Sequence, residues 1–257
     1  MAPSRRRAGR IAVLAMLLKA AGRDLSGQQG ASPPTAVAKG AIDGVVSDTG
    51  LRPLTAASVG ILNTPVVIAT SEGGRFRITD MAPGPYVVTV RKIGYQPIAS
   101  IVHVAPGETA RMSFSLERLA IGLDTVRITE KAQLSWQMRG FESRQKAGLG
   151  SYYTSTDIRK WGGNDLGNFV RRTLGVTVAT DRVSGQSVLT TVRSYGCPML
   201  MVVDEVPMPA GVPLDFLPNL KEIAAIEVYK NGNVVPARYA PGGAACGAVL
   251  IWTKTGY

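Results

Sequence analysis

The stretch EGGRFRI, residues 72–78, joins a glycine turn to a run in which polar and apolar residues alternate. Such period-two alternation is typical of a strand with one buried face, and the paired glycines favour a hairpin. Six further strand-like runs surround it, at residues 41–46, 57–62, 66–70, 86–91, 98–104 and 110–116. Seven short strands separated by turn residues predict an antiparallel β-sandwich over residues 38–118.

The same region carries several motifs in a fixed order. They are Gly44–Asp48, Pro53-Leu54, Gly74-Arg75-Phe76, Pro83–Tyr86 and Gly94-Tyr95. In this order the motifs resemble the carboxypeptidase regulatory-like domain, a transthyretin-like sandwich. The resemblance implies a non-catalytic accessory fold that often precedes the plug of an outer-membrane receptor, although a fold alone does not fix a function.

Residues 151–257 show a different pattern, which predicts a small mixed α+β domain and makes the whole chain mainly β with an α+β part. Asn164-Asp165 is a candidate helix N-cap before Leu166–Thr173, where apolar residues recur at helical spacing, and Gly175 is a candidate helix end. Ser155–Asp157 is a second candidate N-cap. Strands are predicted at residues 176–178, 188–192, 199–203, 223–229 and 248–253.

Motifs in this second half resemble the plug domain of TonB-dependent receptors. Asp165–Val176 is similar to the family's D-L…P-G-V segment, with Leu174 in place of the usual proline. Val202–Pro207 is similar to its D-G-V-P turn, with Glu205 where glycine is usual. Ile223–Gly232 and Gly247–Lys254 resemble the segments that close the plug. Because no run of barrel strands follows, we expect a binding or gating module rather than a transport channel. The alternatives are a stand-alone periplasmic version, a fragment, or half of a split system whose barrel is a separate chain.

Residues 119–150 are expected to form a linker, with some helix over residues 133–146. Within it, LDTVRIT at 123–129 looks like a TonB box, an extended peptide that an energising protein captures by adding it to a sheet edge. The box residues would be Asp124, Thr125, Val126, Arg127 and Ile128. A final sandwich strand or a structured linker is the alternative reading of this segment.

The first 31 residues predict a signal peptide and leader. Four arginines precede a short apolar run, and small residues follow it at Ala20–Gly22. We therefore expect export to the periplasm or the cell outer membrane, and the alternative is an uncleaved interfacial anchor. This segment holds +5 of the formal net charge of +11, so the remainder carries only +6, with no basic run that would indicate nucleic-acid binding.

Two cysteines, Cys197 and Cys246, are present. In an exported chain an even pair predicts a disulfide, and two unpaired buried thiols are the alternative. We expect no metal site, because zinc takes four ligands and the one histidine, His103, is remote in the sequence.

No catalytic pattern is evident, so we expect neither enzymatic activity nor a cofactor. His103 lies in an alternating run and is predicted to point outward, whereas Asp204 and Glu205 are predicted to be turn residues. Glu227, in a predicted central strand, requires an ion pair or hydrogen bond.

The expected partner is a TonB-type energising protein or a separate outer-membrane barrel. The alternative function is a secreted carbohydrate-binding or adhesive module, for which the sandwich offers four aromatic residues, at least two of them expected in the core. They are Phe76, Tyr86, Tyr95 and Phe114.

Overall fold

The computed structural model describes residues 38–119, 130–181, 185–192, 196–240 and 244–255, with side chains described from Gln137 onward in the second range. The predicted signal peptide and the candidate TonB box lie outside the described residues. Among the described helices, none is long and apolar enough to cross a membrane.

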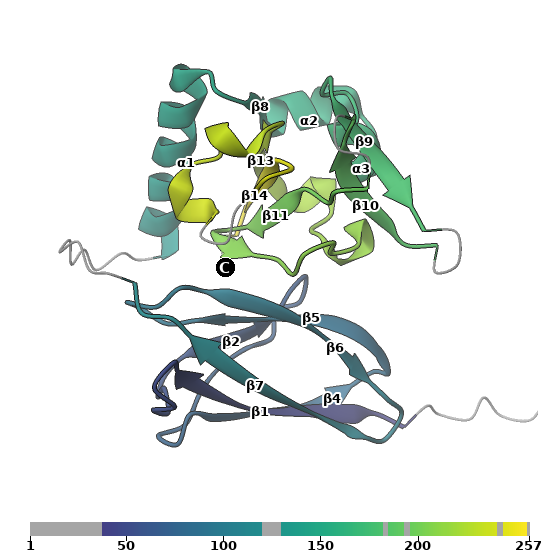
Figure 1. Ribbon diagram of the computed structural model, residues 1–257. Coiled ribbons are helices and arrows are strands. Elements are labelled where there is room, and N and C mark those ends of the chain that lie inside the picture. Colours follow the sequence, from purple (N-terminus) through teal and green to yellow (C-terminus); the bar gives the residue numbers. More distant parts are fainter. Residues whose placement is uncertain (1–37, 120–129, 182–184, 193–195, 241–243, 256–257) are drawn as a thin grey trace, which may run out of the picture. The chain divides into compact units, whose positions relative to one another are not determined.

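All seven strands predicted for the N-terminal half are present, and they form two sheets (Figure 1). The first sheet has the order β4-β1-β7, and the second has the order β3-β2-β5-β6. The bounds are β1 Gly40–Asp48, β2 Ser58–Ile61, β3 Val67–Ala69, β4 Arg75–Met81, β5 Gly84–Arg91, β6 Ile98–Val104 and β7 Thr109–Leu116.

One pairing corrects the expectation of a purely antiparallel sandwich. β1 pairs with β7 in parallel over its whole length, from Ala41 opposite Thr109 to Asp48 opposite Leu116. The other pairings in the two sheets are antiparallel. Periodicity indicates which residues face the core but not the direction of the neighbouring strand, so the sequence pattern could not distinguish the two arrangements.

Apolar residues from both sheets meet in a single sandwich core. Ile42 and Val46 of β1 are fully buried there, beside Phe76 and Phe114, whose ring centroids lie 6.2 Å apart. Gly44 lies between these two β1 residues and opposite Phe76 across the strand pair. A Cβ atom on Gly44 would collide with the Phe76 ring, so the missing side chain gives this ring its place in the core.

The C-terminal half contains a five-stranded mixed sheet of order β12-β11-β14-β13-β8 and a separate hairpin, β9–β10. Its central strand, β14, pairs in parallel with β11 and antiparallel with β13. The strand bounds are β8 Ser151–Thr154, β9 Val176–Thr180, β10 Ser187–Thr191, β11 Leu200–Val203, β12 Val206–Pro207, β13 Ile223–Tyr229 and β14 Ala248–Thr253. β8 and β12 were not anticipated from the sequence, whereas the other five were.

Helical elements cover both faces of this sheet (Figure 1). α2, α3 and the β9–β10 hairpin bury Ile158, Phe169 and Leu189 against one face. α1 buries Phe141 against the other, with Tyr239 from a short 3-10 helix. The bounds are α1 Glu130–Ala147, α2 Ser155–Trp161, α3 Leu166–Val170 and 3-10 helices at Leu214–Phe216, Leu220–Glu222, Gly232–Val234 and Ala237–Tyr239.

The helix ends follow from local chemistry. The Thr154 and Asp157 side chains form a capping box at the start of α2, one residue ahead of the predicted cap. Asp165 caps α3 through a 2.6 Å hydrogen bond from the Asn168 N–H, as predicted. α3 is shorter than predicted: it ends at Val170, whereas the sequence pattern predicted a helix that continues to Thr173.

α1 lies within the 119–150 segment that the sequence analysis assigned to a linker. Its buried Phe141 packs edge-on against Tyr152 of β8, with ring centroids 5.8 Å apart. The helix is therefore part of the C-terminal core.

Candidate functional site

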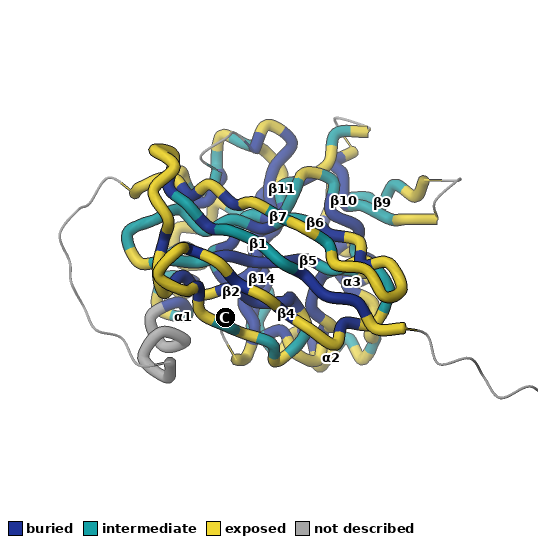
Figure 2. The backbone as a smooth tube through the Cα atoms, turned by 90° about the horizontal axis from the view of Figure 1, so that it is seen from below, coloured by how far each residue is buried: buried dark blue, intermediate teal, exposed yellow. Residues whose placement is uncertain are grey.

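The outward face of the β4-β1-β7 sheet is basic and rich in hydroxyl groups. Arg75 and Arg77 project from β4 and Arg111 from β7, and all three are exposed. The strand register places Asp43 between Arg77 and Arg111, and Val45 between Arg75 and Ser113. Figure 2 views the sandwich from the side on which this sheet lies, and exposed residues recur along β4 and β7.

These side chains surround a shallow hollow of about 710 Å³. It is lined by Asp43, Gly44, Val45, Ser71, Arg75, Phe76, Arg77, Arg111, Met112 and Ser113. The Arg77 guanidinium forms an ion pair with Asp43 at 3.0 Å. Among the residues that the structure describes, no carboxylate pairs with Arg75 or Arg111. The hollow thus holds two cationic groups available to an anion.

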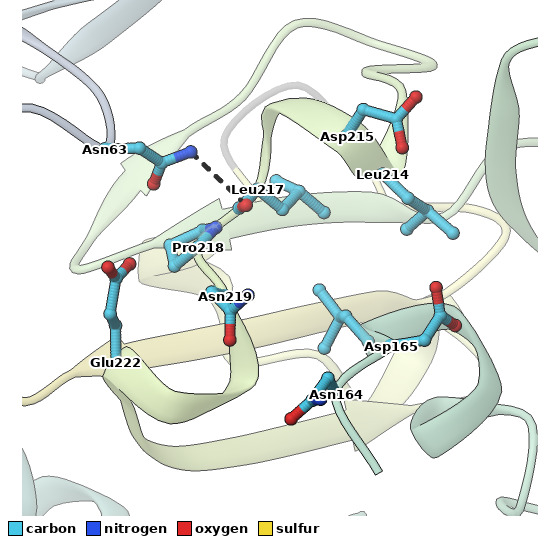
Figure 3. Close-up of a pocket in the computed structure, with 10 residues that line it drawn as sticks. Asn63, Asn164, Asp165, Leu214, Asp215, Leu217, Pro218, Asn219 and Glu222 are labelled. Atoms are coloured by element: carbon cyan, nitrogen blue, oxygen red, sulfur yellow. Dashed lines mark hydrogen bonds between the residues drawn. The ribbon is translucent and has the colours of Figure 1, made fainter.

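A second hollow, of about 360 Å³, is lined mainly by residues of the C-terminal half and also by Asn63 of the sandwich (Figure 3). Its lining combines six polar or acidic residues with four apolar ones: Asn63, Asn164, Asp165, Leu166, Leu214, Asp215, Leu217, Pro218, Asn219 and Glu222. The Asn63 side-chain amide donates hydrogen bonds to the main-chain oxygens of Phe216 at 3.0 Å and Leu217 at 3.3 Å.

The polar groups of this second hollow serve mainly local structure. Asp165 caps α3, and the Asn219 side chain accepts a hydrogen bond from the Lys221 N–H at 3.0 Å. Glu222 lies on the opposite side of the hollow from Asp165 and Asp215 (Figure 3). Accordingly, no three metal-binding side chains gather anywhere in the described part of the chain.

A buried polar network lies under α1. The Glu227 carboxylate is fully buried and accepts a bidentate pair of hydrogen bonds from Arg144, at 2.9 and 2.7 Å. It also accepts hydrogen bonds from the Tyr229 hydroxyl and the Trp252 indole N–H, each at 2.7 Å. The predicted need of Glu227 for a partner is therefore confirmed, and the partner comes from a helix 83 residues away in the sequence.

Charge and burial shift the ionisation of this network. Burial lowers the pKa of Arg144, but the hydrogen bonds and negative charge of Glu227 outweigh this and raise it. Burial raises the pKa of Tyr239 to about 12, and the Arg144 guanidinium lies 5.3 Å from the centroid of its ring. The phenol therefore stays neutral and the guanidinium charged, so the network is a structural clamp between α1 and the sheet.

Asp204 and Glu205 form the two-residue turn between β11 and β12, as predicted. Their φ angles are +44° and +73°, the left-handed pair that such a hairpin requires. The buried Asp204 carboxylate also accepts hydrogen bonds from the Thr253 N–H at 2.8 Å and hydroxyl at 2.6 Å. The turn is thereby fixed to the end of β14.

The structure joins Cys197 and Cys246 in a disulfide, with their Cα atoms 6.0 Å apart. His103 is exposed on β6, as predicted. The candidate TonB-box residues 124–128 lie outside the described part of the chain. Sequence reasoning missed Arg75 and Arg111 as a pair, because their convergence depends on the parallel β1–β7 register.

A family comparison decides the identity of the sandwich. The model of the carboxypeptidase regulatory-like domain matches residues 41–117. Residues 41–117 form a carboxypeptidase regulatory-like domain. The match leaves the C-terminal half unassigned, and a search of curated proteins found no match to the chain.

Solved structures resemble part of this chain only distantly. The TIE protein of Bacillus anthracis is 20% identical over 32% of this chain and 17% of its own, with a TM-score of 0.30. GBS52, the minor pilin of Streptococcus agalactiae, is 18% identical over 35% of this chain and 49% of its own, with a TM-score of 0.29. Catechol 1,2-dioxygenase from Acinetobacter is 13% identical over 39% of this chain and 58% of its own, with a TM-score of 0.30. The match spans less than two thirds of each of these proteins, and likeness this low says nothing of activity.

Proposed function

We propose that the chain is a non-catalytic binding or gating module of the cell envelope. In it, the C-terminal domain, which follows the regulatory-like sandwich in the sequence, acts as a plug like that of a TonB-dependent receptor. The supporting observation is the anchoring of the Asp204–Glu205 turn to Thr253. These residues belong to two of the motifs that carry the resemblance to plug domains, and they lie 49 positions apart in the sequence. Direct hydrogen bonds make them one structural unit.

The proposal gives the segment at 123–129 the role of a TonB box, and that role can be tested directly. Capture by sheet addition depends on main-chain hydrogen bonds, so Val126→Pro, which removes one N–H donor, is expected to abolish binding. Arg127→Lys leaves the main chain intact and serves as the control.

The measurement is binding of the full chain to the purified periplasmic domain of the energising protein from the same cell. Loss of binding with deletion of residues 123–129 and with Val126→Pro, but not with Arg127→Lys, supports the proposal. Equal binding by all variants would remove the TonB-box role.

The second candidate function is a secreted carbohydrate-binding or adhesive module. It is favoured by one specific observation, the uncompensated arginines around the hollow of the β4-β1-β7 sheet. Binding of the full chain to immobilised polysaccharides tests it, and failure to bind any of them counts against it.

A further inference from the structure

We propose that the outward face of the β4-β1-β7 sheet is a binding site for an acidic polysaccharide, one whose sugars carry carboxylate groups. This inference rests on the second candidate function and narrows its ligand class. It is independent of any plug role for the C-terminal domain.

The arginines of this face are spaced both along and across the sheet. Arg75 and Arg77 are two residues apart on one face of β4, about 7 Å along the strand. Arg111 lies across the sheet from Arg77, on the far side of β1, so two strand spacings of about 4.8 Å separate their backbones. The guanidinium groups therefore form a spaced array rather than a single point, which suits repeated charges along a polymer.

The charges around the hollow are predominantly positive. Asp43 is the one acidic residue lining the hollow, and it pairs with Arg77. Arg75 and Arg111 remain without an ion pair among the described residues, which makes this face attractive to anions. The planar guanidinium fork can hold a carboxylate through two parallel hydrogen bonds.

The remaining side chains favour a sugar polymer over other anions. The outward positions of β1, β4 and β7, all within the described range, add hydroxyl groups but no aromatic ring; the hydroxyl residues are Ser47, Thr79, Thr109, Ser113 and Ser115. Hydroxyls can exchange hydrogen bonds with sugar hydroxyls. Without an exposed aromatic at these positions there is no stacking platform for single-stranded nucleic acid. Val45, the apolar residue at the middle of this face, is half-buried and offers little anchor in a membrane.

The experiment measures binding of the immobilised full chain to three soluble polymers by biolayer interferometry. They are polygalacturonate, its neutral counterpart galactan and polyglutamate, an acidic peptide. We expect binding of polygalacturonate only, weakened between 50 and 200 mM NaCl because exposed charges are screened.

Two pairs of substitutions locate the site. Arg75→Ser with Arg111→Ser removes two unpaired cations from the face and is expected to weaken polygalacturonate binding about tenfold, the effect of about 1.4 kcal/mol. Arg171→Ser with Arg172→Ser removes the same charge from exposed positions in the C-terminal half and is expected to change affinity less than twofold. Ser113→Asp, which adds a negative charge beside the hollow and removes no cation, should weaken binding as well.

Equal weakening by both arginine pairs would overturn the inference, since binding would then reflect net charge. Equal affinity for polyglutamate would overturn it too. If galactan binds and the variant with both Arg75→Ser and Arg111→Ser binds as the native protein does, the carbohydrate-binding function is supported and the site proposed here is refuted. If no polysaccharide binds, both the carbohydrate-binding function and the proposed site are refuted.

Discussion

The clamp between Arg144 and Glu227 predicts a large, local loss of stability when the arginine is removed. Arg144→Met keeps much of the aliphatic stem but leaves the fully buried Glu227 carboxylate without its cation. Removing one partner of a buried pair typically costs 3–5 kcal/mol, so we expect a loss of about 4 kcal/mol in the free energy of unfolding. With a urea m-value of about 2 kcal/mol/M, the midpoint should fall by about 2 M.

Arg238 provides a closely matched control. It also pairs with a glutamate, Glu205, and its guanidinium also lies over Tyr239, at 4.8 Å compared with 5.3 Å for Arg144. The Arg238 side chain is 49% exposed, however, whereas that of Arg144 is 19% exposed. An ion pair so open to water contributes about 1 kcal/mol at most, so Arg238→Met should lower stability by far less.

The assay is urea unfolding followed by tryptophan fluorescence. The sandwich, residues 38–118, contains no tryptophan, so the signal reports on the part of the chain that includes Trp252. Adding Glu227→Gln to the Arg144→Met variant removes the uncompensated charge and should recover part of the loss. Equal losses in Arg144→Met and Arg238→Met, or no recovery in the double variant, would refute the reasoning.

Three further predictions concern the C-terminal half. Replacing Cys197 and Cys246 by alanine should lower the free energy of unfolding by roughly 4 kcal/mol, because the 49-residue separation would no longer be closed in the unfolded chain; an unchanged urea midpoint would contradict this. Gly247→Ala should lower the free energy of unfolding by about 3 kcal/mol or more in the same assay, since φ is +85° and the new Cβ would collide with a main-chain oxygen. Gly148→Ala is the control: φ is +69° but no described atom lies within 4 Å of the new Cβ, so the loss should be about 1 kcal/mol. Burial raises the pKa of Glu205 above its ordinary value of 4.5, despite the nearby arginine. Because the folded state then holds the proton to higher pH than the unfolded state does, the stability of the native protein relative to Glu205→Gln should fall as the pH rises from about 4 through the folded-state pKa. A stability difference that does not change with pH would contradict this prediction.

The sequence predicted the sandwich well because its signals are local. Alternation within EGGRFRI and the six neighbouring runs depends only on which face of each strand is buried, and all seven strands formed. The direction of β7 relative to β1 depends on pairing between residues about 68 positions apart, such as Val46 and Phe114, and no local pattern encodes it.

The same distinction explains what was found and missed in the C-terminal half. The turn at Asp204–Glu205 was predicted because it is a local feature between two apolar runs. The need of Glu227 for a partner followed from its place in an apolar strand, but Arg144, on a mostly polar helix, could not be singled out. β8 was missed because its four residues are all partly buried, so Tyr152 and Tyr153 show no alternation.

The position of β14 has a consequence for the order in which the C-terminal domain can assemble while the chain is being synthesised. β14 lies between β11 and β13, yet it is the last of the five strands to emerge, so β11–β12 and β13–β8 cannot join before residues 248–253 appear. Until then both would present apolar, unpaired edges, a state prone to aggregation. The upstream sandwich has no such delay, since its last strand ends at Leu116. A nascent chain should therefore be able to complete its first domain before the strands of the second can join into one sheet.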